Sequence, residues 1–162
     1  MSDIYIICVE DEPQVLDVIV RDLAALEEVF PIELAHSADE ARELIKEIKE
    51  DGHKIGLALC DHIMPGDNGI DLMIEMQKDS FTENTRKVLV TGQAGLEDTI
   101  QAVNKARLNR YIAKPWDPKD LLEIVKDELT QYVIREEKEL LRFMAVLDQE
   151  RIQEAIRTKG YV

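Results

Sequence analysis

Residues 57–66 read Leu-Ala-Leu-Cys-Asp-His-Ile-Met-Pro-Gly, an apolar run that ends on Asp61 and then turns at Pro65-Gly66. A short apolar run bounded by turn residues predicts a buried strand. A strand that ends on an aspartate presents the carboxylate at the rim of the sheet, where ligands bind in open α/β folds. Asp61 is therefore the first candidate for a functional residue.

Three further apolar runs are followed at once by polar residues. They are Ile4–Val9 before Glu10-Asp11-Glu12, Lys87–Val90 before Thr91-Gly92, and Arg110–Ala113 before Lys114-Pro115. The carboxyl ends of parallel strands meet at one edge of a sheet, so we expect these polar side chains to gather around Asp61.

The composition suits one folded domain with a modest addition. The chain has 162 residues, and its 45% apolar content is enough for a single core. A net charge of −14 argues against a direct nucleic-acid surface, because a phosphate backbone would be repelled. Cys8 and Cys60 lie in predicted strands without metal-ligand spacing, so we expect two reduced core thiols.

The N-terminal apolar run does not predict a targeting or membrane segment. Ile4–Val9 is too short for a signal-peptide core or a membrane span, and Asp3 and Glu10 flank it. We therefore expect a cytoplasmic protein that makes no membrane contact.

Short apolar strands alternate with helical patterns along residues 3–135, which predicts an α/β fold with a parallel sheet covered on both faces. The second strand is expected at Ile32–His36. The five expected helices are marked by Pro13 at the start of the first, by a Ser37/Glu40 capping box, by Gly69, by Leu96, Ile100 and Val103, and by Asp117-Pro118.

Glu10, Asp11 and Asp61 are expected to share one pocket. Like charges so close raise one another's pKa unless a cation neutralises them. Hard oxygen ligands with few fixed protein contacts suit Mg²⁺, which keeps several waters. The sequence therefore predicts a magnesium site.

These residues, in this order on five strand–helix units, resemble the receiver domain of bacterial two-component response regulators. The resemblance implies a flavodoxin-like, doubly wound sheet with strand order 2-1-3-4-5. It also implies that Asp61 accepts a phosphoryl group from a sensor histidine kinase or a histidine phosphotransfer protein. Such a module is not an enzyme beyond its own phosphotransfer and self-dephosphorylation.

The resemblance assigns a role to each site residue. Asp11 and Asp61 would bind Mg²⁺ directly, with the backbone carbonyl of Ile63 as a third ligand, and Glu10 would act mostly through water. The pair Glu10-Asp11 departs from the more usual Asp-Asp, and Asn68 replaces a frequent aspartate in the turn before Gly69.

The remaining roles concern the phosphoryl group and the switch. Lys114 would supply a positive charge to the phosphoryl oxygens and Thr91 a hydroxyl donor, because phosphoryl transfer is catalysed by positioning and electrostatics. The resemblance implies a cis Lys114-Pro115 bond. It also implies that Thr91 moves toward the phosphoryl group and the Tyr111 ring swings inward, altering the face formed by the fourth helix, fifth strand and fifth helix.

Two other functions are alternatives to this interpretation. A haloacid-dehalogenase-like phosphohydrolase also uses an aspartyl phosphate, but it carries the nucleophile in an Asp-x-Asp motif after the first strand, where this chain has Glu10-Asp11-Glu12. A receiver-like scaffold that works without phosphorylation is the second alternative. The intact set of Asp61, Thr91 and Lys114 argues against it.

Residues 1–135 would form the receiver domain and residues 136–162 a C-terminal helical extension. No proline or glycine lies between Pro118 and Gly160, so we expect the last helix to run beyond the core. Leu140, Phe143, Met144 and Leu147 recur at helical spacing and form an apolar stripe. We expect this stripe, within about Glu137–Ile156, to make a homodimer; folding back on the receiver, connecting to a further domain or binding a hetero-partner are the alternatives.

Overall fold

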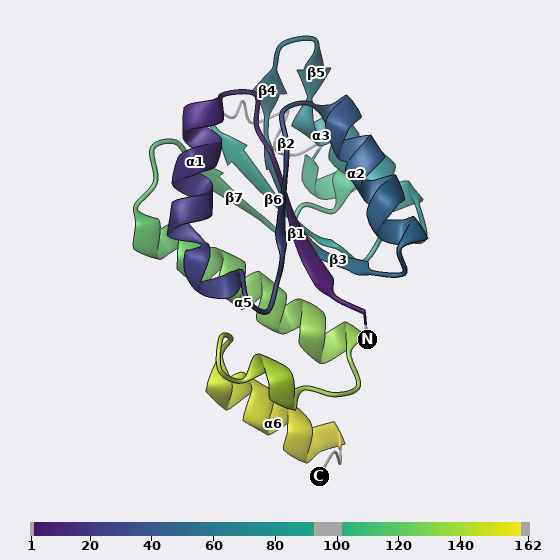
Figure 1. Cartoon of the computed structure of the whole chain (residues 1–162), viewed down its shortest axis with the longest axis vertical. Coiled ribbons are helices and arrows are strands. Elements are labelled where there is room, and N and C mark those ends of the chain that lie inside the picture. Colours follow the sequence, from purple (N-terminus) through teal and green to yellow (C-terminus); the bar gives the residue numbers. More distant parts are fainter. Residues whose placement is uncertain (1, 93–101, 160–162) are drawn as a thin grey trace.

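The computed structural model describes residues 2–92 and 102–159. Its centre is a five-stranded parallel sheet with the order β2-β1-β3-β6-β7, the 2-1-3-4-5 order that the resemblance implied (Figure 1). The strands are β1 (Ile4–Val9), β2 (Ile32–Ala35), β3 (Lys54–Asp61), β6 (Arg86–Thr91) and β7 (Arg110–Ala113). A small antiparallel ribbon of β4 (Ile63–Met64) and β5 (Asp67–Asn68) stands above the carboxyl edge of the sheet.

Helices cover both faces of the sheet. On one face lie α1 (Pro13–Asp22) and α5 (Pro118–Glu136), and on the other α2 (Ala38–Glu50) and α3 (Gly69–Lys78) (Figure 1). A 3₁₀ turn, η1 (Ala24–Leu26), follows α1, and a π-helical turn, η2 (Ala102–Ala106), precedes β7. Among the described residues no helix is both long and apolar enough to cross a bilayer.

Two of the expected helix starts, those of α2 and α5, are confirmed by their side-chain caps. The Ser37 hydroxyl accepts a hydrogen bond from the Glu40 backbone N–H at 3.1 Å, and the Asp117 carboxylate accepts one from Lys119 N–H at 2.9 Å. Such caps satisfy backbone donors that have no partner within the helix. The expected fourth helix falls partly outside the described residues, where Leu96 and Ile100 lie; Val103 belongs to η2.

The sheet separates two apolar cores because successive strand residues point to opposite faces. In β3, Leu57 and Leu59 pack with α1 and α5, whereas Ala58 and Cys60 pack with α2 and α3. Cys8 lies in the first core and Cys60 in the second, and both thiols are free and buried, as predicted. Burial raises the pKa of the Cys60 thiol to about 12.

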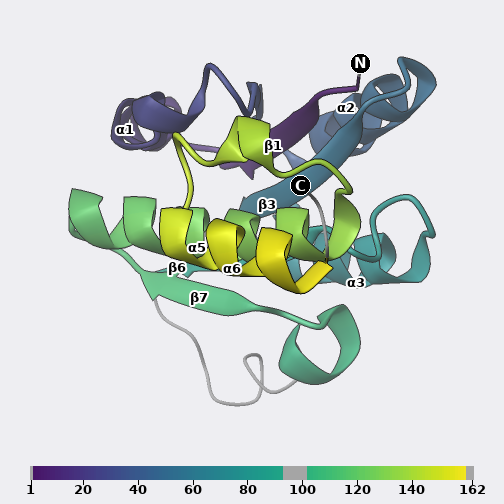
Figure 2. The same ribbon diagram turned by 90° about the horizontal axis from the view of Figure 1, so that it is seen from below.

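The C-terminal extension is helical, as predicted, but the last helix does not run on into it. α5 ends at Glu136, and Glu137 has the extended angles φ −110° and ψ 142°. The chain then turns through η3 (Leu141–Phe143) and returns as α6 (Gln149–Lys159), which lies along α5 (Figure 2). The absence of proline and glycine permits a long helix, but it does not require one when the apolar stripe can be buried by turning back.

The apolar stripe is covered by the chain's own core. Leu140, Phe143 and Leu147 are buried in the same cluster as the inner faces of α1 and α5. The Phe143 ring stacks on Phe30 with centroids 5.6 Å apart. Fold-back on the receiver, one of the alternatives, is therefore what the structure shows.

Polar contacts fasten this extension, residues 137–159, to the receiver. Lys54 on β3 forms an ion pair with Glu137 at 2.7 Å, and the guanidinium of Arg151 on α6 donates to Asp127 and Gln131 on α5. The apolar stripe on which the homodimer prediction rested is therefore buried within the chain's own core. The homodimer itself stays an untested prediction.

Phe143→Ala should destabilise the whole receiver by about 3 kcal/mol or more, because it removes a fully buried ring from the shared core. Leu141→Ala is the matched control, since that side chain is 69% exposed two residues away, and it should change the unfolding free energy by less than about 0.5 kcal/mol. Urea unfolding of both variants measures the difference. Equal, small effects would mean that the extension does not belong to the receiver core.

Candidate functional site

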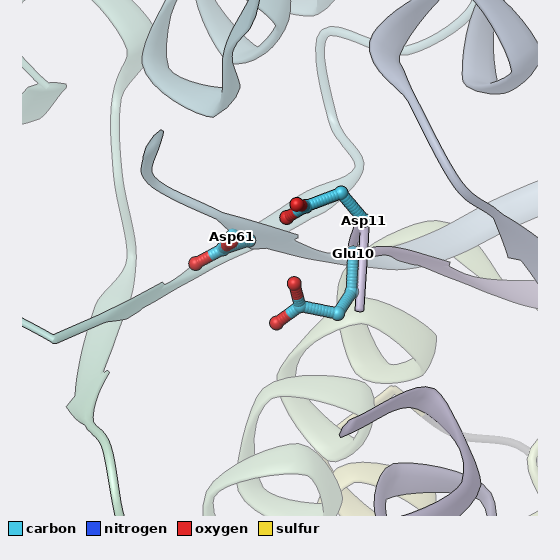
Figure 3. Close-up of side chains that lie close together, drawn as sticks. All are labelled: Glu10, Asp11 and Asp61. Carbon is cyan, nitrogen blue, oxygen red and sulfur yellow. The ribbon is translucent and has the colours of Figure 1, made fainter. Parts of the chain in front are cut away.

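Three carboxylates meet at the carboxyl edge of the sheet. Glu10 and Asp11 follow β1, and Asp61 ends the adjacent strand β3. Each offers an oxygen within 4.8 Å of the others, and Figure 3 shows the three side chains gathered at one place. The structure thus brings together the acidic group that the sequence predicted.

Burial makes it energetically costly for these carboxylates to carry negative charge close together. Glu10 is only 1% exposed and Asp61 6%, whereas Asp11 is half-buried. Buried like charges are costly unless a cation or a hydrogen-bond donor compensates them. The cluster therefore needs positive charge.

Lys114, from the end of β7, supplies one such charge. Its ammonium lies 2.7 Å from a Glu10 oxygen and 3.2 Å from an Asp61 oxygen. Partial burial by itself would lower the pKa of Lys114, but the hydrogen bonds to Glu10 and Asp61 outweigh it, so the pKa is raised. The lysine remains protonated at neutral pH and reaches the phosphoacceptor candidate directly.

The backbone around Lys114 joins the ends of two strands. The Lys114 N–H donates to the Thr91 carbonyl at 2.8 Å, and the Lys114-Pro115 peptide bond is cis, as the resemblance implied. Trp116 packs against the core, and its indole N–H donates to Asp22 on α1 at 3.0 Å. These contacts place the lysine and Thr91 beside one another at the same rim.

The two switch candidates differ in exposure. Thr91 is buried, and its hydroxyl has no hydrogen-bond partner within residues 2–92 and 102–159. The Tyr111 side chain faces outward with 57% exposure. A buried hydroxyl without a partner is an uncommon feature, and it leaves a donor available at the carboxylate edge.

Asp61 is positioned by packing that sequence reasoning missed. A Cβ atom at Gly69 would lie 2.0 Å from the Asp61 carbonyl oxygen, so only glycine lets the start of α3 approach the end of β3 this closely. The adjacent residue His62 is buried; its N–H donates to the Val90 carbonyl and its carbonyl accepts from the Gly69 N–H, at 2.9 and 2.8 Å. In sequence, Gly69 marked only a helix start.

The residues present fit a divalent cation. Three carboxylates offer hard oxygen ligands from two strand ends, which is the donor set that Mg²⁺ prefers. Asn68, which replaces a frequent aspartate of the family, caps α3 by accepting from the Ile70 N–H at 2.8 Å. The role expected of the Ile63 carbonyl as a metal ligand stays a prediction.

Comparison with known proteins identifies this arrangement. Residues 6–126, well over half of the chain, match the family described as the response regulator receiver domain. The chain belongs to this family. Receiver domains are regulatory modules, so the match decides against the haloacid-dehalogenase-like alternative.

Individual relatives agree with the assignment. The hydrogenase transcriptional regulatory protein HoxA of Cupriavidus necator is 33% identical over 121 residues, which are 75% of this receiver chain and 23% of that protein. The CheY homolog of Campylobacter jejuni, a chemotaxis protein, is 29% identical over 124 residues, covering 76% of this chain and 91% of that one. A CheY-like receiver domain protein from Methanospirillum hungatei has a solved structure that superposes with a TM-score of 0.69 at 31% identity, covering 81% of this chain and 97% of that one.

The two HoxA relatives are much longer than this chain. The chain spans only 23% of the Cupriavidus HoxA and 26% of the HoxA of Bradyrhizobium diazoefficiens. What those longer regulators do as whole proteins is therefore a separate question from what the receiver does.

Gly69→Ala should weaken the receiver by about 2 kcal/mol or more, because the new methyl group meets backbone that cannot move without displacing Asp61. Gly92→Ala is the matched control at the same edge, where an added Cβ would meet no atom of the described residues within 4 Å. Chemical unfolding of the two variants measures the effect. Wild-type stability of Gly69→Ala would contradict the packing described for Asp61.

Proposed function

We propose that the chain is a phosphorylation-controlled response regulator that accepts a phosphoryl group on Asp61. The observation that carries the proposal is the position of the Lys114 ammonium, 3.2 Å from the Asp61 carboxylate, within a buried acidic cluster. A lysine that contacts the acceptor directly suits the charge developing in phosphoryl transfer. The donor would be the phosphohistidine of a sensor kinase or of a phosphotransfer protein.

The residues divide the chemistry among them. An Asp61 oxygen attacks phosphorus; the new P–O bond forms as the bond between phosphorus and the histidine nitrogen breaks, and that nitrogen leaves with the electron pair. Lys114 neutralises charge on the phosphoryl oxygens, and the Thr91 hydroxyl donates a hydrogen bond to one of them. Bound Mg²⁺, held by Asp11 and Asp61 with Glu10 acting through water, would add further charge neutralisation. Attack of water on phosphorus later releases phosphate and restores Asp61.

The signal would leave the site through Thr91 and Tyr111. The Thr91 hydroxyl has no partner among the described residues, so a phosphoryl oxygen could recruit it without breaking an existing hydrogen bond. The exposed Tyr111 ring, on the neighbouring strand β7, would then turn inward and change the face made by β7 and α5. A phosphorylation-independent scaffold would require neither the lysine contact nor the available hydroxyl.

The output would be a protein contact, made in the cytoplasm. The strongly negative charge disfavours direct binding to nucleic acid by the receiver. We propose no specific target, since the named relatives include both transcriptional and chemotaxis regulators.

Asp61→Asn should abolish acid-labile phosphate incorporation from acetyl phosphate, because the amide is a poor nucleophile in this transfer. Asp71→Asn, on the exposed first turn of α3, is the matched control and should be labelled like the wild type. Labelling of the wild type should also stop when EDTA removes Mg²⁺, since Lys114 alone neutralises only part of the charge of the three carboxylates, which then repel the donor. Mass spectrometry of the intact protein and of its peptides measures both effects; full labelling of Asp61→Asn at another residue would overturn the assignment.

Thr91→Ala should still be phosphorylated on Asp61 but should no longer move Tyr111, because the hydroxyl is the proposed link. Thr91→Ser retains the hydroxyl and should behave like the wild type. The measurement is the change in the Tyr111 ring resonances on addition of beryllofluoride and Mg²⁺. An unchanged Tyr111 response in Thr91→Ala would show that the switch runs by another route.

A further inference from the structure

A polar cavity lies at the edge of the sheet opposite the acidic cluster. It has a volume of about 390 Å³ and is bounded by the amino ends of β6 and β7, the end of α3 and the end of α5. Lys87 lines it near the start of β6, and Thr91 of the carboxylate edge ends the same strand. Thr91 lies four positions beyond Lys87, about 13 Å along the strand, so the cavity is distinct from the candidate phosphoacceptor site.

The cavity is basic although the chain as a whole is strongly acidic. Its charged lining residues are the cations Arg86, Lys87, Arg107 and Arg135 and the anions Glu83 and Glu136. Arg86 is already neutralised by Glu128, whose carboxylate accepts from it at 2.7 and 2.9 Å. The remaining cations outnumber the lining anions in a protein of net charge −14.

Arg107 and Arg135 are the accessible cations. Neither makes a hydrogen bond or ion pair with a side chain in the described parts of the chain, and both are exposed. Arg107 has a left-handed backbone, with φ 53°, directly after the π-helical turn η2. Both backbone forms are rare for such residues and often accompany functional sites, which distinguishes Arg107 from an ordinary surface arginine.

Lys87 adds a buried positive charge beneath them. The ammonium donates to the Gln77 side-chain oxygen at 3.0 Å and the Thr85 carbonyl at 2.9 Å, both of which are neutral acceptors. Burial, followed by repulsion from Arg86, lowers the pKa of Lys87 to about 8. The lysine is therefore still mostly charged at neutral pH, and no carboxylate bonds to it among the described residues.

We propose that this cavity binds a small phosphate monoester through Arg107 and Arg135. A guanidinium matches phosphate oxygens in a bidentate geometry, and a phosphate monoester offers three terminal oxygens, enough to accept from both arginines. A simple carboxylate offers only two oxygens. The cavity exceeds the volume of a phosphate group alone, and the exposed side chain of Val103 with Leu108 offers an apolar wall to an organic group.

Adenosine monophosphate is a suitable probe, with adenosine as the probe that lacks phosphate. Titrations followed by calorimetry and by amide chemical shifts, in EDTA to exclude metal-dependent binding at Asp61, should show binding of the monophosphate and not of adenosine. The shifts should lie around residues 83–87 and 107–109. The experiment needs neither Mg²⁺ nor phosphorylation, so its result is independent of whether the proposed phosphotransfer is correct.

The double variant Arg107→Gln, Arg135→Gln should weaken monophosphate binding about tenfold or more, because each lost guanidinium removes a charge-assisted pair. The double variant Arg21→Gln, Lys46→Gln is the matched control for net charge, since both side chains are exposed, on α1 and α2, and it should bind like the wild type. Asp61→Asn should also bind normally. Equal binding of adenosine and its monophosphate, or unchanged affinity in the Arg107→Gln, Arg135→Gln variant, would overturn the proposal.

Discussion

The close approach of Glu10, Asp11 and Asp61 is the constraint on which the rest of the site depends. Adjacent parallel strands bring their carboxyl ends to one rim, and here both ends carry acids that are largely buried. Such a group is tolerable only with nearby positive charge. Lys114 provides it from β7, two strands away from β3, and its placement requires the sheet order β1-β3-β6-β7.

The start of α3 packs against the end of β3 and thereby positions Asp61. Gly69 lets α3 begin against the Asp61 carbonyl, and Asn68 caps that helix. Backbone packing thus positions Asp61, the candidate acceptor, while Thr91 retains a hydroxyl that has no partner in the described residues. A closely packed acceptor candidate beside an available donor is the arrangement that the proposed switch at Thr91 and Tyr111 would need.

The extension is part of this receiver rather than an appendage to it. Its apolar residues share the α1–α5 core, and Arg151 of α6 contacts Asp127, the residue that also pairs with Arg110 at 2.9 Å. Arg110 directly precedes Tyr111 in β7. The extension therefore belongs to the same charged network as the strand that carries the switch candidate.

The sequence by itself determined the local features of this protein. The strands Ile4–Val9 and Arg110–Ala113, the caps at Ser37 and Asp117, and the polar residues at the strand ends were all readable, because each depends on neighbours within a few residues. Their gathering into one site followed from the parallel strand ends. Tertiary structure alone decided the path after Glu136, where nothing local distinguishes a continuing helix from one that turns back to bury Phe143 against Phe30. It also decided why residue 69 must be glycine and which cations line the cavity beneath β6, since both depend on atoms distant in sequence that only the folded chain brings together.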